Sequence, residues 1–227
     1  MIRRLRLASG QVLWFYIACH FLNHSLGLIS LGAAETGLKI AAATWQSWPG
    51  TALLYGAFGV HLTLALAGLH QRHTLRLPPL ELMRIVFGLT IPLLLFGHVV
   101  GTRVAYSLYG EPAQYQRVVA GLLSSGNTGW QLALLAPGWL HGCMGLNVAF
   151  RHRAWFQRSR GLLIGFAIAL PLCAAGGYWA MTRDVAALGE LRGHLLTAYL
   201  GLLAAVLVSR SWRDWRAWRR RELGSSP

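Results

Sequence analysis

Four histidines lie deep inside apolar stretches of the sequence, and they are the residues whose type and spacing could support chemistry. They are His24, His61, His98 and His141, each within a run that is otherwise as apolar as lipid. An ionisable side chain at such a depth in a membrane is costly and is usually functional. Neutral imidazole is the commonest protein ligand for metal ions. Four buried imidazoles on four consecutive helices therefore suggest two metal centres, each held by a pair of them.

The depths of these histidines sort them into two pairs. On a helix that rises about 1.5 Å per residue, His61 and His141 each lie roughly 13 Å from the inner end of their apolar runs. His98 lies roughly 24 Å and His24 roughly 18 Å from the same side. We therefore expect an inner pair, His61 with His141, and an outer pair, His24 with His98. Two stacked pairs fit two bis-histidine haem groups, which exchange electrons because both axial positions of each iron are filled.

Other residues near these pairs could assist or compete. His20 precedes His24 by one helical turn and shares its face, so it is the alternative ligand on the first helix or a partner of a haem propionate. Arg103 follows His98 on the same helix and could pair with a propionate or extend toward the lipid interface. Small residues beside the histidines could make room for a flat macrocycle, although glycine is also common where membrane helices pack. These glycines are Gly27, Gly59, Gly97, Gly101, Gly142 and Gly145.

The composition indicates a membrane protein with little soluble mass. Of the 227 residues, 55% are apolar and only 12% are charged, whereas about a quarter of a typical soluble domain is charged. Six apolar segments are long enough to span a bilayer as helices, because a span needs about 20 residues. They cover roughly 12–33, 51–70, 83–107, 129–150, 161–182 and 190–209. We therefore predict an all-α, six-helix transmembrane bundle over residues 1–209, with a haem-binding four-helix core from spans 1 to 4.

The net charge of +14 comes from arginines concentrated in the gaps between the apolar segments. Most lie near residues 3–6, 72–84, 151–160 and 210–221, which fall on one side of the predicted bundle. The positive-inside rule then places both termini in the cytoplasm, as expected for a multi-pass protein of the bacterial inner membrane. Arginines placed in this way argue against nucleic-acid binding and for contact with membrane lipid. The basic tail, 210–227, is rich in Trp and Arg and predicts either an interfacial helix on anionic lipid or a linker to a cytoplasmic partner.

Two segments on the outer side, 34–50 and 108–128, are long enough to fold over the bundle as lids. Glu35, Tyr55 and Arg103 are the candidates at this end for proton-coupled chemistry with a quinol. The three cysteines lie inside apolar runs and form no C-x-x-C pair. A zinc site, an iron–sulfur cluster and a covalently attached haem are therefore not predicted.

Four stretches of the sequence resemble one protein family. They are His20-Phe-Leu-Asn-His-Ser-Leu-Gly-Leu28, Leu54-Tyr-Gly-Ala-Phe-Gly-Val-His61, Ile91-Pro-Leu-Leu-Leu-Phe-Gly-His-Val-Val-Gly-Thr-Arg103 and Trp139-Leu-His-Gly-Cys-Met-Gly-Leu146. They resemble the hexahelical haem-b membrane anchor of bacterial class III adenylate cyclases, which is similar to the cytochrome b subunit of succinate dehydrogenase and fumarate reductase. The resemblance runs from about residue 10 to 185. It implies two haem b groups, quinone or quinol as redox partner, and pairing of the first ligand helix with the third and the second with the fourth.

The same resemblance implies a redox-sensing anchor for a cytoplasmic effector of the adenylate cyclase type. The ferredoxin-like and catalytic domains of that family have no counterpart in this sequence. We therefore expect a chain that is not catalytic on its own, either an anchor or a cytochrome b subunit of a respiratory oxidoreductase, with a homodimer compatible with both. Two further alternatives remain open. The first is a haem-free transporter that uses its membrane histidines as a proton relay, and the second is a purely structural anchor.

Overall fold

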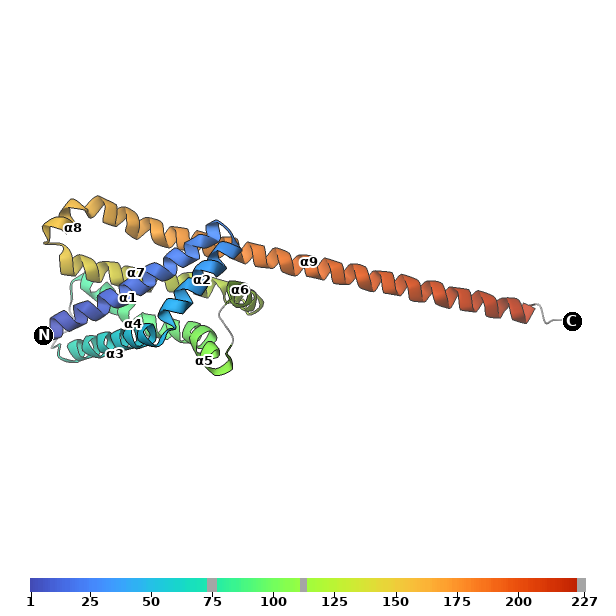
Figure 1. Cartoon of the computed structure of the whole chain (residues 1–227), viewed down its shortest axis with the longest axis horizontal. Coiled ribbons are helices and arrows are strands. Elements are labelled where there is room, and N and C mark those ends of the chain that lie inside the picture. Colours follow the sequence, from blue (N-terminus) through green and yellow to red (C-terminus); the bar gives the residue numbers. More distant parts are fainter. Residues whose placement is uncertain (73–76, 111–113, 224–227) are drawn as a thin grey trace. The chain divides into compact units, whose positions relative to one another are not determined.

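The chain is a set of helices, with no strand among the described residues. A computed structural model describes residues 1–72, 77–110 and 114–223. The chain divides into two compact units, Met1–Asp184 and Val185–Pro227. The first unit holds α1 to α8 and the first part of α9, and the second holds the rest of α9 (Figure 1). The all-α prediction is therefore confirmed.

The helices follow one another through short connections. Their bounds are α1 (Ile2–Ser25), η1 (Leu26–Leu28), α2 (Leu31–Trp45), α3 (Trp48–His70), α4 (Pro79–Val99), η2 (Val100–Val104), α5 (Ala105–Tyr109), α6 (Tyr115–Ser124), α7 (Thr128–Phe150), α8 (Ala154–Arg158) and α9 (Arg160–Leu223). The short element η2 is a π-helical turn that joins α4 directly to α5. Such turns often occur at functional sites, and this one follows His98.

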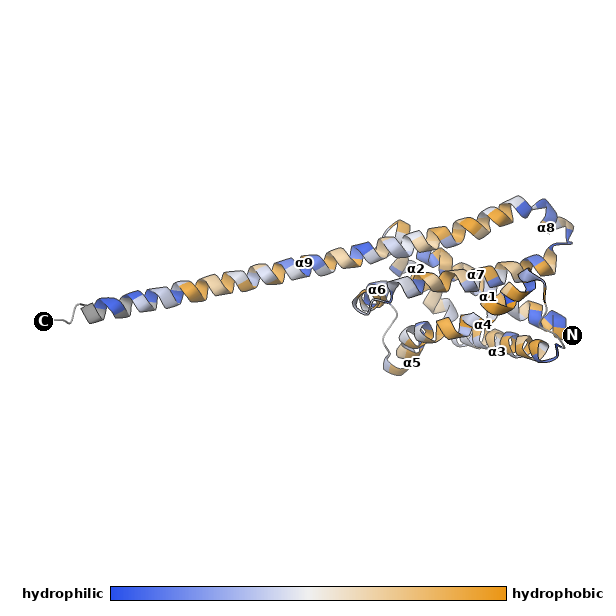
Figure 2. Ribbon diagram, turned by 180° about the vertical axis from the view of Figure 1, so that it is seen from behind, coloured by the Kyte–Doolittle hydropathy of each residue, from blue (hydrophilic) through white to orange (hydrophobic). Residues whose placement is uncertain are grey.

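Four stretches of helix are long and apolar enough to cross a membrane, counting only the described residues. They are Trp48–His70, Pro79–Tyr109, Thr128–Phe150 and Arg160–Arg213. Apolar residues cover much of these helices, including faces that point away from the rest of the unit (Figure 2). Leu93 and Phe96, for example, are 70% and 64% exposed. Helices that face lipid need this outward apolar surface, so the structure agrees with a multi-pass membrane protein.

The first predicted span, 12–33, is displaced in the structure. Helix α1 begins at Ile2, ten residues earlier than expected, and ends at Ser25. Ser30 then starts α2, because its hydroxyl oxygen accepts a hydrogen bond from the Ala33 amide at 3.0 Å. A serine N-cap of this kind separates two helices even within an apolar run. The segment predicted as the first lid is therefore largely helical.

The predicted spans 161–182 and 190–209 are both carried by α9, which is a single helix of 64 residues. The prediction of two separate spans relied on the polar residues between them. Positions 183–189 read Arg-Asp-Val-Ala-Ala-Leu-Gly and contain no proline. Helix-forming residues of this kind allow a helix to continue through a polar segment. Among the described residues four helices have membrane length, and the six-span count is not confirmed.

The core of the first unit lies where α1, α7 and the beginning of α9 meet. Trp139 is 2% exposed, stacks on Trp14 with ring centroids 5.6 Å apart, and donates its indole N–H to the Ala167 carbonyl at 2.7 Å. Helix α1 also packs along α3, and α4 packs along α7 (Figure 1). Two packed pairs, α1 with α3 and α4 with α7, therefore build the bundle.

Helix α9 approaches α1 at a glycine. A Cβ atom placed on Gly177 would lie 2.1 Å from the His24 carbonyl oxygen, which is far inside van der Waals contact. The obstacle is backbone, so it cannot move aside as a flexible side chain could. Gly177 therefore sets how closely α9 supports the part of α1 that carries His20 and His24.

We predict that Gly177→Ala destabilises the protein, since the added methyl group must push two helix backbones apart. Overpacking of this kind costs about 1–3 kcal/mol, which exceeds the helix-propensity gain of roughly 1 kcal/mol. Gly165→Ala is the matched control, because nothing lies within 4 Å of a Cβ at that position of the same helix. Thermal unfolding in detergent, followed by circular dichroism, should give a lower midpoint for Gly177→Ala and an unchanged or higher one for Gly165→Ala. Equal midpoints would contradict this account of the contact.

Candidate functional site

One cavity of about 970 Å³ runs through the first unit. Its lining includes all four histidines singled out from the sequence and His20 as well. Ligand pockets typically measure about 300–1,000 Å³, so this cavity can enclose a large group. The lining is mostly apolar and has polar side chains at both ends, which is the composition expected around an amphiphilic cofactor.

The inner part of the cavity contains His61 and His141 on opposite walls. His61 comes from α3 and His141 from α7, and their ring centroids are 6.1 Å apart with the ring planes at 90°. Metal–imidazole nitrogen bonds are about 2 Å long. Two imidazoles that share one metal ion between them therefore have centroids roughly 6 Å apart. The predicted inner pair has this spacing.

The hydrogen bonds of the inner pair determine which ring nitrogen faces the cavity. Nδ1 of His61 lies 3.1 Å from the Arg6 carbonyl oxygen, and Nδ1 of His141 lies 2.8 Å from the Arg84 carbonyl oxygen. A carbonyl oxygen only accepts, so in each contact Nδ1 must be the donor and carry the proton. The lone pair of each neutral ring is then on Nε2. An N–H group held by an acceptor while the other nitrogen is free is the arrangement found in metal-ligating histidines.

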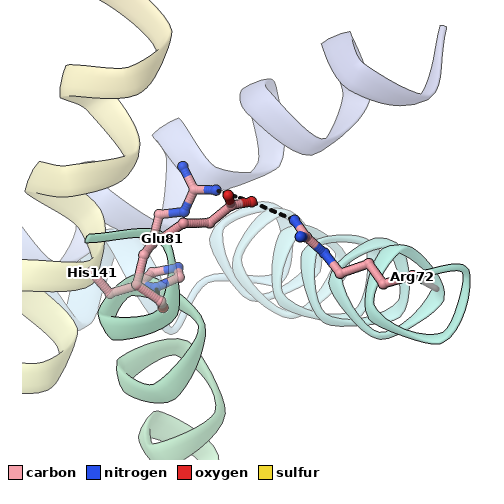
Figure 3. Close-up of polar contacts among 4 residues, drawn as sticks. Arg72, Glu81 and His141 are labelled. Carbon is pink, nitrogen blue, oxygen red and sulfur yellow. Dashed lines mark hydrogen bonds and ion pairs between the residues drawn. The ribbon is translucent and has the colours of Figure 1, made fainter. Parts of the chain in front are cut away.

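Arginines collect at the inner end of the cavity. Arg72 from the end of α3 forms an ion pair with Glu81 at the start of α4, near His141 (Figure 3). Glu81 also lies 4.0 Å from Arg84, whose carbonyl holds His141. Arg72 and Arg84 line the cavity together with Arg3 and Arg6. One carboxylate thus ties two of four arginines in place, and the excess positive charge suits an anionic group at this end.

The outer part of the cavity brings His20 and His98 together. Their ring centroids are 5.8 Å apart and their planes meet at 75°, which repeats the geometry of the inner pair. Nδ1 of His98 lies 3.2 Å from the side-chain oxygen of Gln131 on α7. This oxygen accepts, so the lone pair of His98 is again on Nε2.

His24 lies on the far side of His20 and has a different set of partners. Its Nε2 is 3.1 Å from Nε2 of His20, and its Nδ1 is 3.3 Å from the Tyr115 hydroxyl. That hydroxyl accepts a hydrogen bond from the Asn23 side chain at 2.6 Å. Burial raises the pKa of the Tyr115 hydroxyl well above its usual value, so the group stays protonated and donates to His24. We expected His24 to be the partner of His98, and in the structure the ring that lies against His98 is that of His20.

The bundle contains an internal repeat that also distinguishes the two histidines. Arg6, Gly10 and His20 recur 78 positions later as Arg84, Gly88 and His98. Helices α3 and α7 likewise have 23 residues each and occupy positions 80 apart. At an offset of 78, the counterpart of His24 is Thr102, whose hydroxyl donates to the His98 carbonyl at 2.7 Å. The repeat therefore pairs His20, rather than His24, with His98.

The estimated depths of His20, His24 and His98 also change. The first span was expected to begin at residue 12, but α1 begins at Ile2. Counted from the true helix starts, His20 lies 18 residues beyond Ile2 and His98 lies 19 beyond Pro79. The two therefore sit at nearly the same height. On α1, Gly10 lies against His61 of the inner pair and His20 belongs to the outer pair. The two pairs are therefore separated by ten residues of this helix, or roughly 15 Å.

Two glycines make room for the inner pair, and the sequence analysis had not selected them. A Cβ on Gly10 of α1 would lie 2.9 Å from Cε1 of His61, and a Cβ on Gly88 of α4 would lie 2.7 Å from Cε1 of His141. Both glycines line the cavity. By contrast, nothing lies within 4 Å of a Cβ at Gly59, Gly97, Gly101 or Gly145. The glycines that leave room for the two rings thus lie on the helices opposite the histidines. The 78-residue repeat is the sequence signal that could have identified them.

The remaining predicted residues separate into those that reach the cavity and those that do not. Arg103 lines it; one guanidinium nitrogen donates to the Thr51 hydroxyl at 3.0 Å, and the other, Nη1, is buried without a hydrogen-bond partner among the described residues. Tyr55 also lines the cavity. Glu35 instead accepts a hydrogen bond from the Gln116 amide at 3.0 Å and thereby joins α2 to α6.

The two predicted lid segments both reach the outer part of the cavity. Helix α2 contributes Leu38 and Trp45 to its lining, and α6 contributes Tyr115 and Val118. Helices α2 and α6 also contact each other. The outer end of the cavity is therefore covered by segments that lie outside the four membrane-length helices.

Within the described part of the chain, no group of three or more His, Cys, Asp or Glu side chains is placed to hold a metal ion together. The arrangement is instead one of facing pairs. Comparisons of the chain with protein-family models, with curated proteins and with solved structures find no match. The conclusions about this site therefore rest on its own geometry.

Proposed function

We propose that the chain is a di-haem b membrane cytochrome. The inner haem is ligated by His61 and His141, and the outer haem by His20 and His98, with His24 beside the outer site. The observation that carries the proposal is the repeated pair geometry. At two levels of one cavity, imidazoles face each other with ring centroids 6.1 Å and 5.8 Å apart.

The residues present fit haem in three further respects. Three of the proposed ligands, His61, His141 and His98, are neutral imidazoles whose Nδ1 protons are held elsewhere, at the carbonyls of Arg6 and Arg84 and at Gln131. Gly10 and Gly88 accommodate the rings of the inner pair, which a Cβ at either position would meet. Arginines stand at both ends of the cavity, where they can pair with propionates, and the orphan Nη1 of Arg103 is a free donor for one of them.

Haem held by these residues would supply one-electron exchange. The protein supplies the rest. The carbonyls of Arg6 and Arg84 and the amide of Gln131 fix the ring orientation and keep the proton on Nδ1. Apolar side chains from α1, α3, α4 and α7 line the cavity between the two levels. The two haem groups would lie roughly 15 Å apart by helix rise.

Quinone or quinol is the proposed redox partner at the outer end. Tyr55 and Arg103 are the polar cavity residues there that can reach a quinone headgroup, whereas Glu35 is engaged with α6. The electrons would report the quinone pool to a cytoplasmic effector of the adenylate cyclase type, or serve an oxidoreductase in which this chain is the cytochrome b subunit. The sequence resemblance supports both of these functions, and each requires haem at both sites.

A haem-free proton relay is the second candidate, and one observation favours it. His20, His24 and Tyr115 form a continuous hydrogen-bonded chain from the cavity to α6, with contacts of 3.1 Å and 3.3 Å. Such chains conduct protons in membrane transporters. The relay needs no pigment and makes no use of the carbonyl partners of His61 and His141, so the spectrum of the protein separates the two functions.

We predict that the purified protein binds two haem b groups per chain and shows their α-band after dithionite reduction. His61→Ala and His98→Ala should each remove one haem, because each takes away an axial ligand of a different site. His70→Ala is the control, since His70 is exposed on α3. Pyridine haemochrome quantitation measures the stoichiometry. A colourless wild-type protein, expressed with ample haem, would exclude the cytochrome and leave the relay.

The assignment of the outer ligand is tested separately. We predict that His20→Ala loses the outer haem, while His24→Ala keeps two haems because His24 is only hydrogen-bonded to His20. Low-temperature electron paramagnetic resonance of the oxidised protein distinguishes the two low-spin sites. If His24→Ala lost the outer signal and His20→Ala kept it, the assignment would be reversed.

The glycine opposite His141 gives a steric test of the inner site. We predict that Gly88→Leu displaces His141 and removes the inner haem, since even a Cβ there would lie 2.7 Å from the ring. Gly97→Leu on the same helix is the matched control, because its Cβ meets nothing within 4 Å. Helical content by circular dichroism shows whether each variant has folded. A folded Gly88→Leu protein that retained both haems would show that this glycine does not shape the site.

A further inference from the structure

The second unit ends in a helical segment of unusual composition, which we call the Trp–Arg segment (210–222). It contains six arginines against two acidic residues, with tryptophans at every third position from Trp212. Neither haem ligation nor quinone chemistry uses it. The segment is part of α9, so its side chains are presented on a helix.

The tryptophans and arginines of this segment are stacked on one another. The rings of Trp212 and Trp215 have centroids 4.9 Å apart and planes 22° from parallel. Arg216 lies over the Trp212 ring and Arg219 over the Trp215 ring, each with its guanidinium carbon 5.0 Å from the ring centroid. Stacking uses the flat face of a guanidinium and leaves its N–H edges free. Each pair is therefore an ordered set of donors with no ion-pair acceptor among the described side chains of the segment.

The positive charge of the segment is also not balanced by ion pairs that the described side chains form. Those ion pairs join Glu81 with Arg72 and Arg84, in the first unit. Arg210, Arg213, Arg216, Arg219 and Arg220 are all exposed. An exposed row of guanidinium donors binds carboxylates or phosphates well.

The position of the segment along α9 selects among these anions. Residues 195–209 directly before it are mostly apolar and all exposed, as a helix facing lipid would be. They belong to Arg160–Arg213, the stretch of α9 that is long and apolar enough to contain a membrane span. Because α9 is unbroken, Arg210 begins where the apolar surface ends. Phosphates of the adjacent lipid headgroups are therefore the anions nearest to the arginines, and Trp rings are favoured at the same interface.

We infer that the Trp–Arg segment is a binding surface for anionic phospholipid headgroups. The Trp212–Arg216 and Trp215–Arg219 pairs hold guanidinium edges toward lipid phosphates at the membrane boundary. A basic side chain near an anionic surface contributes about 1 kcal/mol, or roughly fivefold in an equilibrium constant. Removing both stacked arginines should therefore shift the balance between bound and free segment by roughly 25-fold. This inference does not depend on haem.

Hydrogen–deuterium exchange of the full-length protein in nanodiscs tests the surface. Discs of phosphatidylcholine alone are compared with discs that also contain phosphatidylglycerol. We expect amides of 210–220 to exchange more slowly in the anionic discs, and the difference to shrink at high salt, which screens exposed charges. Equal exchange in the two discs would overturn the inference.

Variants separate the stacked pairs from general positive charge. Arg216→Gln with Arg219→Gln should lose most of the lipid-dependent protection. Arg183→Gln with Arg192→Gln is the matched control, because it removes the same charge from exposed positions of the same helix. Equal loss in both double variants would overturn the assignment to the stacked pairs. Protection of 210–220 by an added RNA oligonucleotide but not by phosphatidylglycerol would instead make the segment a nucleic-acid surface and also overturn it.

Discussion

The structure depends on how the Nδ1 protons of its buried imidazoles are held. An imidazole inside an apolar bundle needs a hydrogen-bond partner, because an unpaired buried polar group is costly. His61 and His141 obtain one from the main-chain carbonyls of Arg6 and Arg84, which belong to neighbouring helices. These contacts fix the approach of α3 to α1 and of α7 to α4. They also leave the lone pair of each ring on Nε2, so the interaction that satisfies each histidine in the fold leaves that nitrogen unprotonated.

The internal repeat shows that this arrangement, in which a main-chain carbonyl of one helix accepts a hydrogen bond from a histidine of the helix packed against it, occurs twice. Arginine, glycine and histidine stand at the same relative positions on α1 and α4, and each of these helices supports a histidine of its packed partner, α3 or α7. The glycine is required because the imidazole lies directly over it; Gly10 and Gly88 both meet the ring of the opposing histidine. Two copies of one helix pair therefore enclose the cavity between them, and a pair of facing histidines at each level is the result.

The sequence predicted the helical class, the membrane character and the inner pair of His61 and His141 as neighbours, because apolar length and depth depend only on local sequence. It misplaced the start of α1, since Arg3, Arg4 and Arg6 look like a flank although they are helical. The earlier start of α1 changes the depth estimate on which the preference for His24 over His20 depended. Gln131 and the carbonyls of Arg6 and Arg84 could not be predicted from residue type, since their roles depend on which helices meet. The unbroken α9 was missed because a polar stretch interrupts hydropathy without interrupting a helix.

The outer level is where the two halves of the repeat differ. In the second half, Thr102 bonds its own helix, whereas His24 at the equivalent position bonds His20 and Tyr115. Tyr115 belongs to α6, and the neighbouring Gln116 is held by Glu35 of α2. The inner level is bounded by helices of the repeat alone. His24 thus connects the outer level to α6, and through Glu35 to α2, and neither helix belongs to the repeat. His24 itself is not one of the two facing histidines at this level. A repeated scaffold with one modified end therefore gives the two levels different surroundings.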